Sequence, residues 1–314
     1  MIIQFSHNGP ELNLSKRSAK NGKAYEFTTP TASAGIRFWN NEASHKRKFI
    51  KSHGWYLENT GNSFDPIPKA GELSFWGEWE PQSRFVLTGN KYSRTPSLLH
   101  AVHNPIFSTH GIGKHNTDPF VFGEHFYYTN CKQGTFTFLR RLTNDSIIIF
   151  GSYKNRKDFM IDSVFVVGNS ESVHDYRISP TDYPSVLRQA TIDLHDGLPN
   201  HYKLYQGKMY DFGSHYSVEN PYTFCFVPCI IDCDCKGFER PVIDPVKFNL
   251  QKPGAGMATK RIDYKSETDF WNELVYDILD KGFSLGIKFK MPPIDNTLEF
   301  PEYEKSGTKC GRGC

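Results

Sequence analysis

The chain has 314 residues, a formal net charge of +3 and a hydrophobic fraction of 38%. This length accommodates one large domain or two small ones with a sizeable core, and an aromatic content of 15% supplies large rings to fill that core. The mild positive charge permits a polyanionic partner such as nucleic acid without requiring one.

No apolar run approaches the roughly 20 residues that a membrane-spanning helix needs, so we expect no membrane partner. The first residues have neither the positive charge nor the long apolar stretch of a signal peptide. Six of the seven Cys follow residue 224, and this odd, clustered set does not match a secreted disulfide framework. We therefore predict a cytoplasmic protein with reduced thiols. The sequence leaves the oligomeric state open.

Short apolar or alternating runs between turn residues predict β-strands along most of the chain. Residues 145–152 and 159–168 are strongly apolar, and the turns around them predict an antiparallel meander with 135–139. We expect 84–88 to pair with 72–79, and 201–206 with 207–212. The predicted strands are 1–5, 35–39, 72–79, 84–88, 135–139, 145–152, 159–168, 201–206, 207–212, 222–229 and 282–289.

Capping residues predict four helices. A basic helix begins at Asn40 or Asn41 and ends near Gly54, and its cations form either a solvated surface or a phosphate-contacting patch. A second covers 96–103, with Thr95 as its cap, and a short third lies around 184–190. The clearest helix covers 267–281, because Ser266 caps it, Gly282 ends it and apolar residues recur at helical spacing.

These elements predict an α+β fold with a mainly antiparallel twisted sheet, or a partly closed β-barrel, and a few peripheral helices. The chain has no internal repeat and no low-complexity linker. We therefore expect a single composite domain over 1–314. If it divides, the parts are a pocket-bearing β-rich core, 1–168, and a C-terminal α+β extension, 169–314.

The densest set of polar, reactive side chains lies between His110 and Gln133, a loop flanked by apolar strands. The histidines here and just before it share no spacing with a known metal motif, so we predict hydrogen-bonded neutral imidazoles rather than a metal site. As a catalytic set, Glu80 or Asp118 would act as general base or electrostatic stabiliser, with His103 or His115 as the acid.

An aromatic segment, FWGEWE, begins at Phe75. Trp76 and Trp79 next to carboxylates suit stacking and edge recognition of a nucleic-acid base, or they fill the core. The amides of Asn116, Asn130 and Gln133 offer paired donors and acceptors for a base edge.

Lys132 could hold a phosphate as a point charge, whereas Asp118, which precedes a proline, could simply shape a turn.

The segment FYYTNCK at 126–132 resembles the strand end of EVE-type domains, which are PUA-like β-barrels. The run NDSIIIF at 144–150 is similar to a barrel strand of ASCH- and EVE-like modules. The resemblance covers about residues 126–167. It implies a PUA-like barrel that recognises a modified or flipped base, with Asn130 and Lys132 at the pocket.

Four cysteines lie at Cys225, Cys229, Cys233 and Cys235. Their spacing does not match the C-x2-C pairs of zinc knuckles and ribbons, so a structural zinc and free, partly buried thiols are the two interpretations.

The sequence thus favours a nucleotide- or nucleic-acid-handling protein that binds a base or nucleotide in an aromatic and polar pocket. One alternative is a hydrolase or glycosyl-transfer enzyme that acts on a nucleotide with Glu or Asp and His as acid and base. The other is a structural or partner-binding protein.

Overall fold

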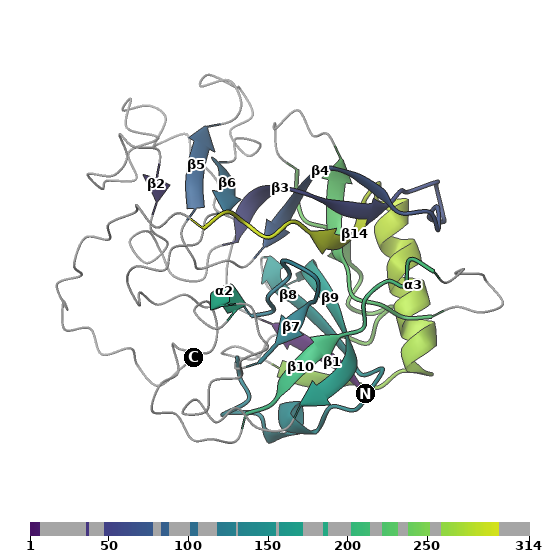
Figure 1. Cartoon of the computed structure of the whole chain (residues 1–314). Helices are drawn as coiled ribbons and strands as arrows, with labels where there is room; N and C mark the ends of the chain where they lie inside the picture. Colours follow the sequence, from purple (N-terminus) through teal and green to yellow (C-terminus); the bar gives the residue numbers. More distant parts are fainter. Residues whose placement is uncertain are drawn as a thin grey trace.

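The computed structural model describes residues 1–6, 36–37, 47–77, 83–87, 101–105, 118–129, 131–154, 157–171, 185–187, 202–213, 222–231, 238–251 and 259–294. These residues form two mainly antiparallel sheets with few helices (Figure 1). Buried side chains from both sheets and from the long helix make one continuous core.

The first sheet has the strand order β13-β1-β8-β9-β10-β7, and β12 also pairs with β9. Next to the edge strand β13, β1 runs parallel to β8, and every residue of β1 is buried, as in a sheet covered on both faces. Its strands are β1 (Ile2–Ser6), β7 (Tyr127–Tyr128), β8 (Ile147–Lys154), β9 (Asp158–Glu171), β10 (Leu204–Gly207), β12 (Val242–Ile243) and β13 (Thr259–Ile262).

The second sheet has the order β14-β11-β4-β3-β6-β5-β2, and β14 pairs again with β3. This extra pairing closes β3, β4, β11 and β14 into a small four-stranded barrel. Its strands are β2 (Ile36–Arg37), β3 (Lys48–Leu57), β4 (Lys69–Gly77), β5 (Ser83–Leu87), β6 (Ala101–Pro105), β11 (Val227–Ile231) and β14 (Ser284–Phe289). The prediction of a mainly antiparallel, partly closed β-rich fold with few helices is confirmed at this level.

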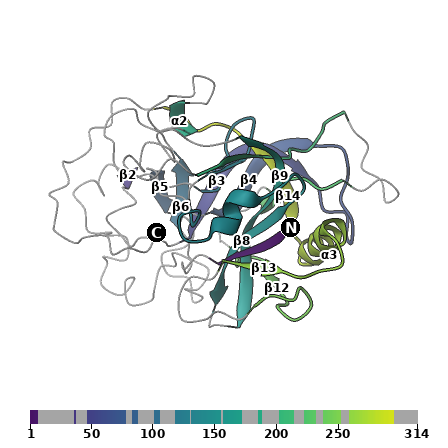
Figure 2. The same cartoon turned by 90° about the horizontal axis from the view of Figure 1, so that it is seen from below.

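The helices within the described ranges are the 3-10 helix η4 (Thr137–Arg141), the short α2 (Ser185–Leu187) and α3 (Glu267–Asp280). Helix α3 lies along one side of the sheets in both views (Figures 1 and 2). Ser266 caps it through a side-chain bond from the Asp269 N–H, as predicted. The predicted apolar stripe is buried, and the Trp271 indole N–H donates to the Phe224 carbonyl, which ties the helix to the segment before β11.

Three predicted elements are wrong. The basic helix is a strand where the structure describes it, because β3 pairs with β4 from Lys48 to Tyr56. Residues 101–103 of the second predicted helix belong to β6, which runs parallel to β3 and antiparallel to β5. The predicted strand 135–139 is instead a turn followed by η4, since the Thr135 and Phe136 N–H groups both bond to the Lys132 carbonyl.

Two predicted pairings are also wrong. Strand β5 pairs with β6 and β2 rather than with 72–79. Strand β10 pairs with β9 and β7, while 208–212 leave the sheet, so the hairpin at 201–212 does not form. The β8–β9 hairpin is confirmed. Strand pairs β1–β13 and β3–β14 both join the chain before residue 168 to the chain after it.

Candidate functional site

A buried carboxylate organises the polar loop singled out in the sequence. Asp118 is only 4% exposed. One of its oxygens accepts from the Thr129 N–H at 2.9 Å and the other from the Cys131 N–H at 2.6 Å. These two N–H groups flank Asn130 in the sequence, and the bonds fix the main chain at the end of β7. Engagement of both oxygens by main-chain donors favours a positioning role for Asp118 over proton transfer.

A pair of stacked phenol rings supports the same strand end. Tyr128 and Tyr205 have ring centroids 5.9 Å apart and an interplanar angle of 9°. The Tyr128 hydroxyl donates to the Cys131 carbonyl at 2.8 Å. Burial, and then the nearby Asp118 carboxylate, raise the pKa of Tyr128 well above its ordinary value. The phenol therefore stays neutral and donates its hydrogen bond. This bond holds the turn after β7 against the stacked rings.

The side-chain amide of Gln133 also forms hydrogen bonds to the main chain. Its amide nitrogen donates to the Lys203 carbonyl and its amide oxygen accepts from the Lys203 N–H, both at 2.7 Å. The same nitrogen donates to the Thr129 carbonyl. This buried side chain thus joins the turn to the segment before β10. The contacts favour a structural role for Gln133 over the reading of a ligand edge.

Lys132 differs from Asp118 and Gln133 in its backbone conformation and in the surroundings of its side chain. Its φ is 65°, in the left-handed region that lysine rarely adopts. Its carbonyl accepts from the Thr135 N–H at 3.0 Å and the Phe136 N–H at 2.8 Å, which closes the turn. The residue is only 7% exposed. Within the part of the chain that the structure describes, no carboxylate lies within ion-pair distance of its ammonium group. A lysine whose stem is covered and whose ammonium group has no counter-charge in reach suits an anionic ligand.

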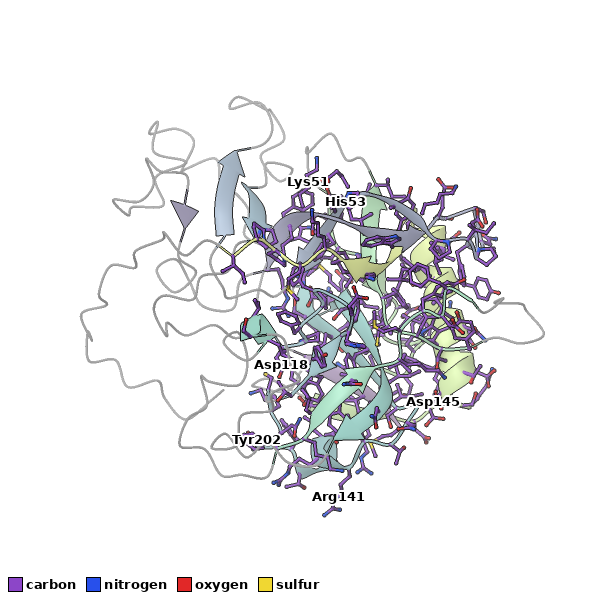
Figure 3. All side chains as sticks on the ribbon, viewed as in Figure 1. Lys51, His53, Asp118, Arg141, Asp145 and Tyr202 are labelled. Carbon is purple, nitrogen blue, oxygen red and sulfur yellow. The ribbon has the colours of Figure 1, made fainter. Side chains whose placement is uncertain are left out.

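Tyr202 adds a ring that no sequence pattern predicts. A Cβ on Gly134 would lie 2.5 Å from the Tyr202 hydroxyl, so this phenol packs directly over the turn and the glycine makes room for it. In Figure 3, Asp118 and Tyr202 lie on the same side of the described structure, with Arg141 at its lower end. The turn thus combines a lysine, an anchored strand end and a tyrosine.

Trp76 lies between the two sheets. It is 2% exposed, its ring packs edge-on against Phe49, and its indole N–H donates to the Phe238 carbonyl at 2.6 Å. It lines a hollow with Pro119 and Asp162 whose volume, about 20 Å³, admits about one water molecule. These contacts favour the core-packing interpretation of Trp76 over base stacking.

The same hollow adjoins a buried ion-pair triad. The Arg47 Nε donates to one oxygen of Asp162 at 2.7 Å, and the Arg240 Nη1 donates to the other at 2.8 Å. Asp162 falls at a register shift between β8 and β9 and is 5% exposed. The sequence predicts that Arg47 belongs to a basic helix whose cations are solvated or contact phosphate; it is instead completely buried in an internal salt bridge.

The structure does not describe the side chains of the remaining predicted site residues. For His103 the structure gives the backbone alone, in register with Ile50 of β3 and Phe85 of β5. The other predicted residues lie outside the described residues, and their roles stay predictions: Glu80, His115, Trp79, Asn116 and Asn130.

The two described cysteines of the C-terminal group are core residues. The Cys225 thiol contacts the main chain of Val166, and the Cys229 thiol that of Ser284, so they face different strands. Burial raises the pKa of Cys225 to about 12 and also raises that of Cys229. The two thiols donate to carbonyls of different strands, which favours the free-thiol interpretation for this pair. Cys233 and Cys235 lie outside the described residues.

In the ranges given above, no three His, Cys, Asp or Glu side chains gather as a metal site requires. No described helix is long and apolar enough to cross a membrane. Comparisons of the chain with protein-family models, with curated proteins and with solved structures found no match.

Proposed function

We propose that this protein handles a nucleotide or nucleic acid and that the turn after β7 binds it. Lys132 contacts a phosphate group, Asn130 reads the edge of the base, and Asp118 positions the strand end that carries both. The observation that carries the proposal is Lys132, a residue that is 7% exposed and whose ammonium group has no carboxylate partner among the described residues.

The backbone at Lys132 supports the same conclusion. A φ of 65° costs a residue with a side chain about 1 kcal/mol relative to glycine. Strained backbone positions gather at ligand-binding and catalytic sites, where surrounding contacts hold them. Here those contacts are the bonds from Thr135 and Phe136 to the Lys132 carbonyl, together with the bond from the Cys131 N–H to Asp118. A lysine at a position suited to glycine therefore supports a role for its charge.

The resemblance to EVE-type domains supports a base as part of the ligand. In those domains the Asn-Cys-Lys strand end lines a modified-base pocket, and here the matching residues are Asn130, Cys131 and Lys132. The aromatic strand β7 belongs to the sheet with β10, β9 and β8 rather than to the closed four-stranded barrel. The proposed PUA-like relationship accordingly concerns that sheet, and a cytoplasmic location forms part of the proposal.

The test is equilibrium binding of nucleoside monophosphates and of the matching nucleosides, with three variants of one residue. Lys132→Met keeps the buried stem and removes the charge, so phosphate-dependent affinity should fall by about 10- to 100-fold, the value of a charged hydrogen bond. Lys132→Arg keeps the charge and should retain most of the affinity. Lys132→Gly relieves the left-handed backbone and should lose binding while the protein remains folded.

The control is Lys208→Met, because Lys208, which follows β10, is a partly exposed lysine paired with Asp145, which precedes β8. Nucleotide binding by folded Lys132→Met at the wild-type affinity would refute the proposal. Equal affinity of wild-type protein for nucleosides and nucleotides would refute the phosphate contact.

A further inference from the structure

The segment that follows Lys132 is rich in cations and lacks acids. From Cys131 to Asn144 the sequence contains Lys132, Arg140 and Arg141 and no Asp or Glu. Within the described structure, neither arginine forms an ion pair. Lysines elsewhere behave differently, since Lys69 and Lys288 each pair with a carboxylate. Uncompensated charge on one segment attracts a polyanion.

A second element adds to this charge. Arg261 of β13 places its guanidinium 5.2 Å from the centre of the Phe138 ring, so η4 and β13 meet at this contact. Arg261 is exposed, and the nearby Asp263 forms no ion pair with it among the residues seen in the structure. Arg261 therefore brings a third guanidinium group to the element that carries Arg140 and Arg141.

Phenylalanine rings on the same segment are only partly covered. Phe136 and Phe138 have ring centroids 5.7 Å apart, and both retain exposure to solvent. The Phe136 N–H bonds to the Lys132 carbonyl, so these rings directly continue the turn of the candidate site. Tyr202, which packs over Gly134, lies at the same end of the molecule as Arg141 (Figure 3). Partly exposed rings on a segment that carries cations form the pattern with which proteins stack unpaired bases and neutralise phosphates.

We infer that this region, the η4–β13 surface, binds single-stranded nucleic acid. It consists of Phe136, Phe138, Arg140, Arg141 and Arg261. The guanidinium groups contact phosphates and the rings stack against bases. Arg140 and Arg141 also lie in the last turn of η4, where cations stabilise a helix end, but that role explains neither Arg261 nor the exposed rings. The inference extends the proposed function, which requires only one nucleotide at Lys132, to a strand that runs onward from it.

The test is fluorescence anisotropy with labelled single-stranded DNA and RNA of about 12 nucleotides, within the usual site sizes, and with a duplex of the same length. Replacement of Arg140, Arg141 and Arg261 by Ala should weaken single-strand binding by roughly 10-fold or more at low salt. It should also make the salt slope shallower by about 2, as expected for three lost phosphate contacts. Phe138→Ala should weaken binding by about 5- to 150-fold, the range for one lost base stack.

The matched control replaces Lys69, Lys281 and Lys288 by Ala, which removes the same charge from surfaces where those lysines pair with acids. Thermal unfolding confirms that each variant is folded. An unchanged affinity and salt slope in the triple arginine variant would overturn the inference, as would tighter binding of the duplex than of either single strand.

Mononucleotide binding separates the inference from the proposed function. If the triple arginine variant loses the strand but keeps a Lys132-dependent mononucleotide, both stand. If wild-type protein binds the mononucleotide and no strand, only the inference fails. If strand binding depends on the arginines while Lys132→Met leaves mononucleotide affinity unchanged, only the proposed function fails.

Discussion

Replacement of Asp162 by Ala should destabilise the protein more than almost any other single change. The Asp162 carboxylate forms an ion pair with each of two guanidinium groups, and both Arg47 and Arg240 are essentially excluded from solvent, at 0% and 2% exposure. Loss of one partner of a buried ion pair costs about 3–5 kcal/mol, because the other charge stays buried. Since Asp162 pairs with two cations, we expect a loss of stability at the upper end of this range, about 4–5 kcal/mol. That is a large part of the 5–15 kcal/mol that typically separates folded from unfolded protein.

The assay is equilibrium unfolding in urea, followed by tryptophan fluorescence. Trp76 is a suitable reporter because it lines the same hollow as Asp162. Arg47→Met leaves the Asp162–Arg240 contact in place and should cost less, about 1–3 kcal/mol. The matched control is Asp145→Asn, at an exposed ion pair with Lys208 where φ is 63° and asparagine is tolerated. It should cost less than about 1 kcal/mol. A loss for Asp162→Ala as small as that control would refute this account of the core.

Three further predictions concern the candidate site and the core. Asp118→Asn should destabilise the protein by about 1–3 kcal/mol, because an amide cannot accept from both main-chain N–H groups at once; unfolding in urea checks this, and a neutral result would contradict the anchor. Replacement of Cys225 and Cys229 by Ser should leave the rapid reaction of the native protein with a disulfide reagent unchanged, since burial keeps both thiols protonated. The folded pKa values of Cys225 and Tyr205, about 12 in both cases, exceed the ordinary values of 9.0 and 10.0, so the unfolded chain loses these protons first. Stability should therefore fall as pH rises from about 9 towards 12; thermal midpoints check the fall, and a flat profile would contradict it.

Helix α3 could be predicted almost completely because its signals are local. The cap, the apolar stripe and the stop at Gly282 all lie within one stretch of sequence, and Gly282 has the positive φ, 85°, that a helix end of this type uses. Sequence spacing alone determines such a pattern.

Strand β3 could not be predicted in the same way. Its cations and an asparagine cap favoured a helix, whereas the strand is stabilised by pairing with β4 and with β14, which lies more than 200 residues away in the chain. Arg47 shows the same limit for a side chain. It belongs to a cluster of cations that looks like a solvated surface, and its partner Asp162 is 115 residues distant. Only the tertiary structure reveals that this charge is internal.

The candidate site lies between these cases. Asp118, Lys132 and Gln133 could be singled out together because one short loop carries them, and the structure does bring them close to one strand end. Their separate roles could not be predicted, because they depend on distant residues. Gln133 hydrogen-bonds to the main chain of Lys203, 70 residues away, and the neighbouring Tyr202 packs against the turn at Gly134.

Lys132 is the residue of this loop whose surroundings do not suit it. Local preference would place glycine or asparagine at a φ of 65°, and burial would favour an apolar or paired side chain, yet the chain has an ammonium group there. Asp118 and Gln133, by contrast, each have hydrogen-bond partners that explain their burial. Sequences usually agree with their fold at every level, and the exceptions concentrate at functional positions. Two independent conflicts at one residue are therefore better evidence for a binding role than the polar composition of the whole loop.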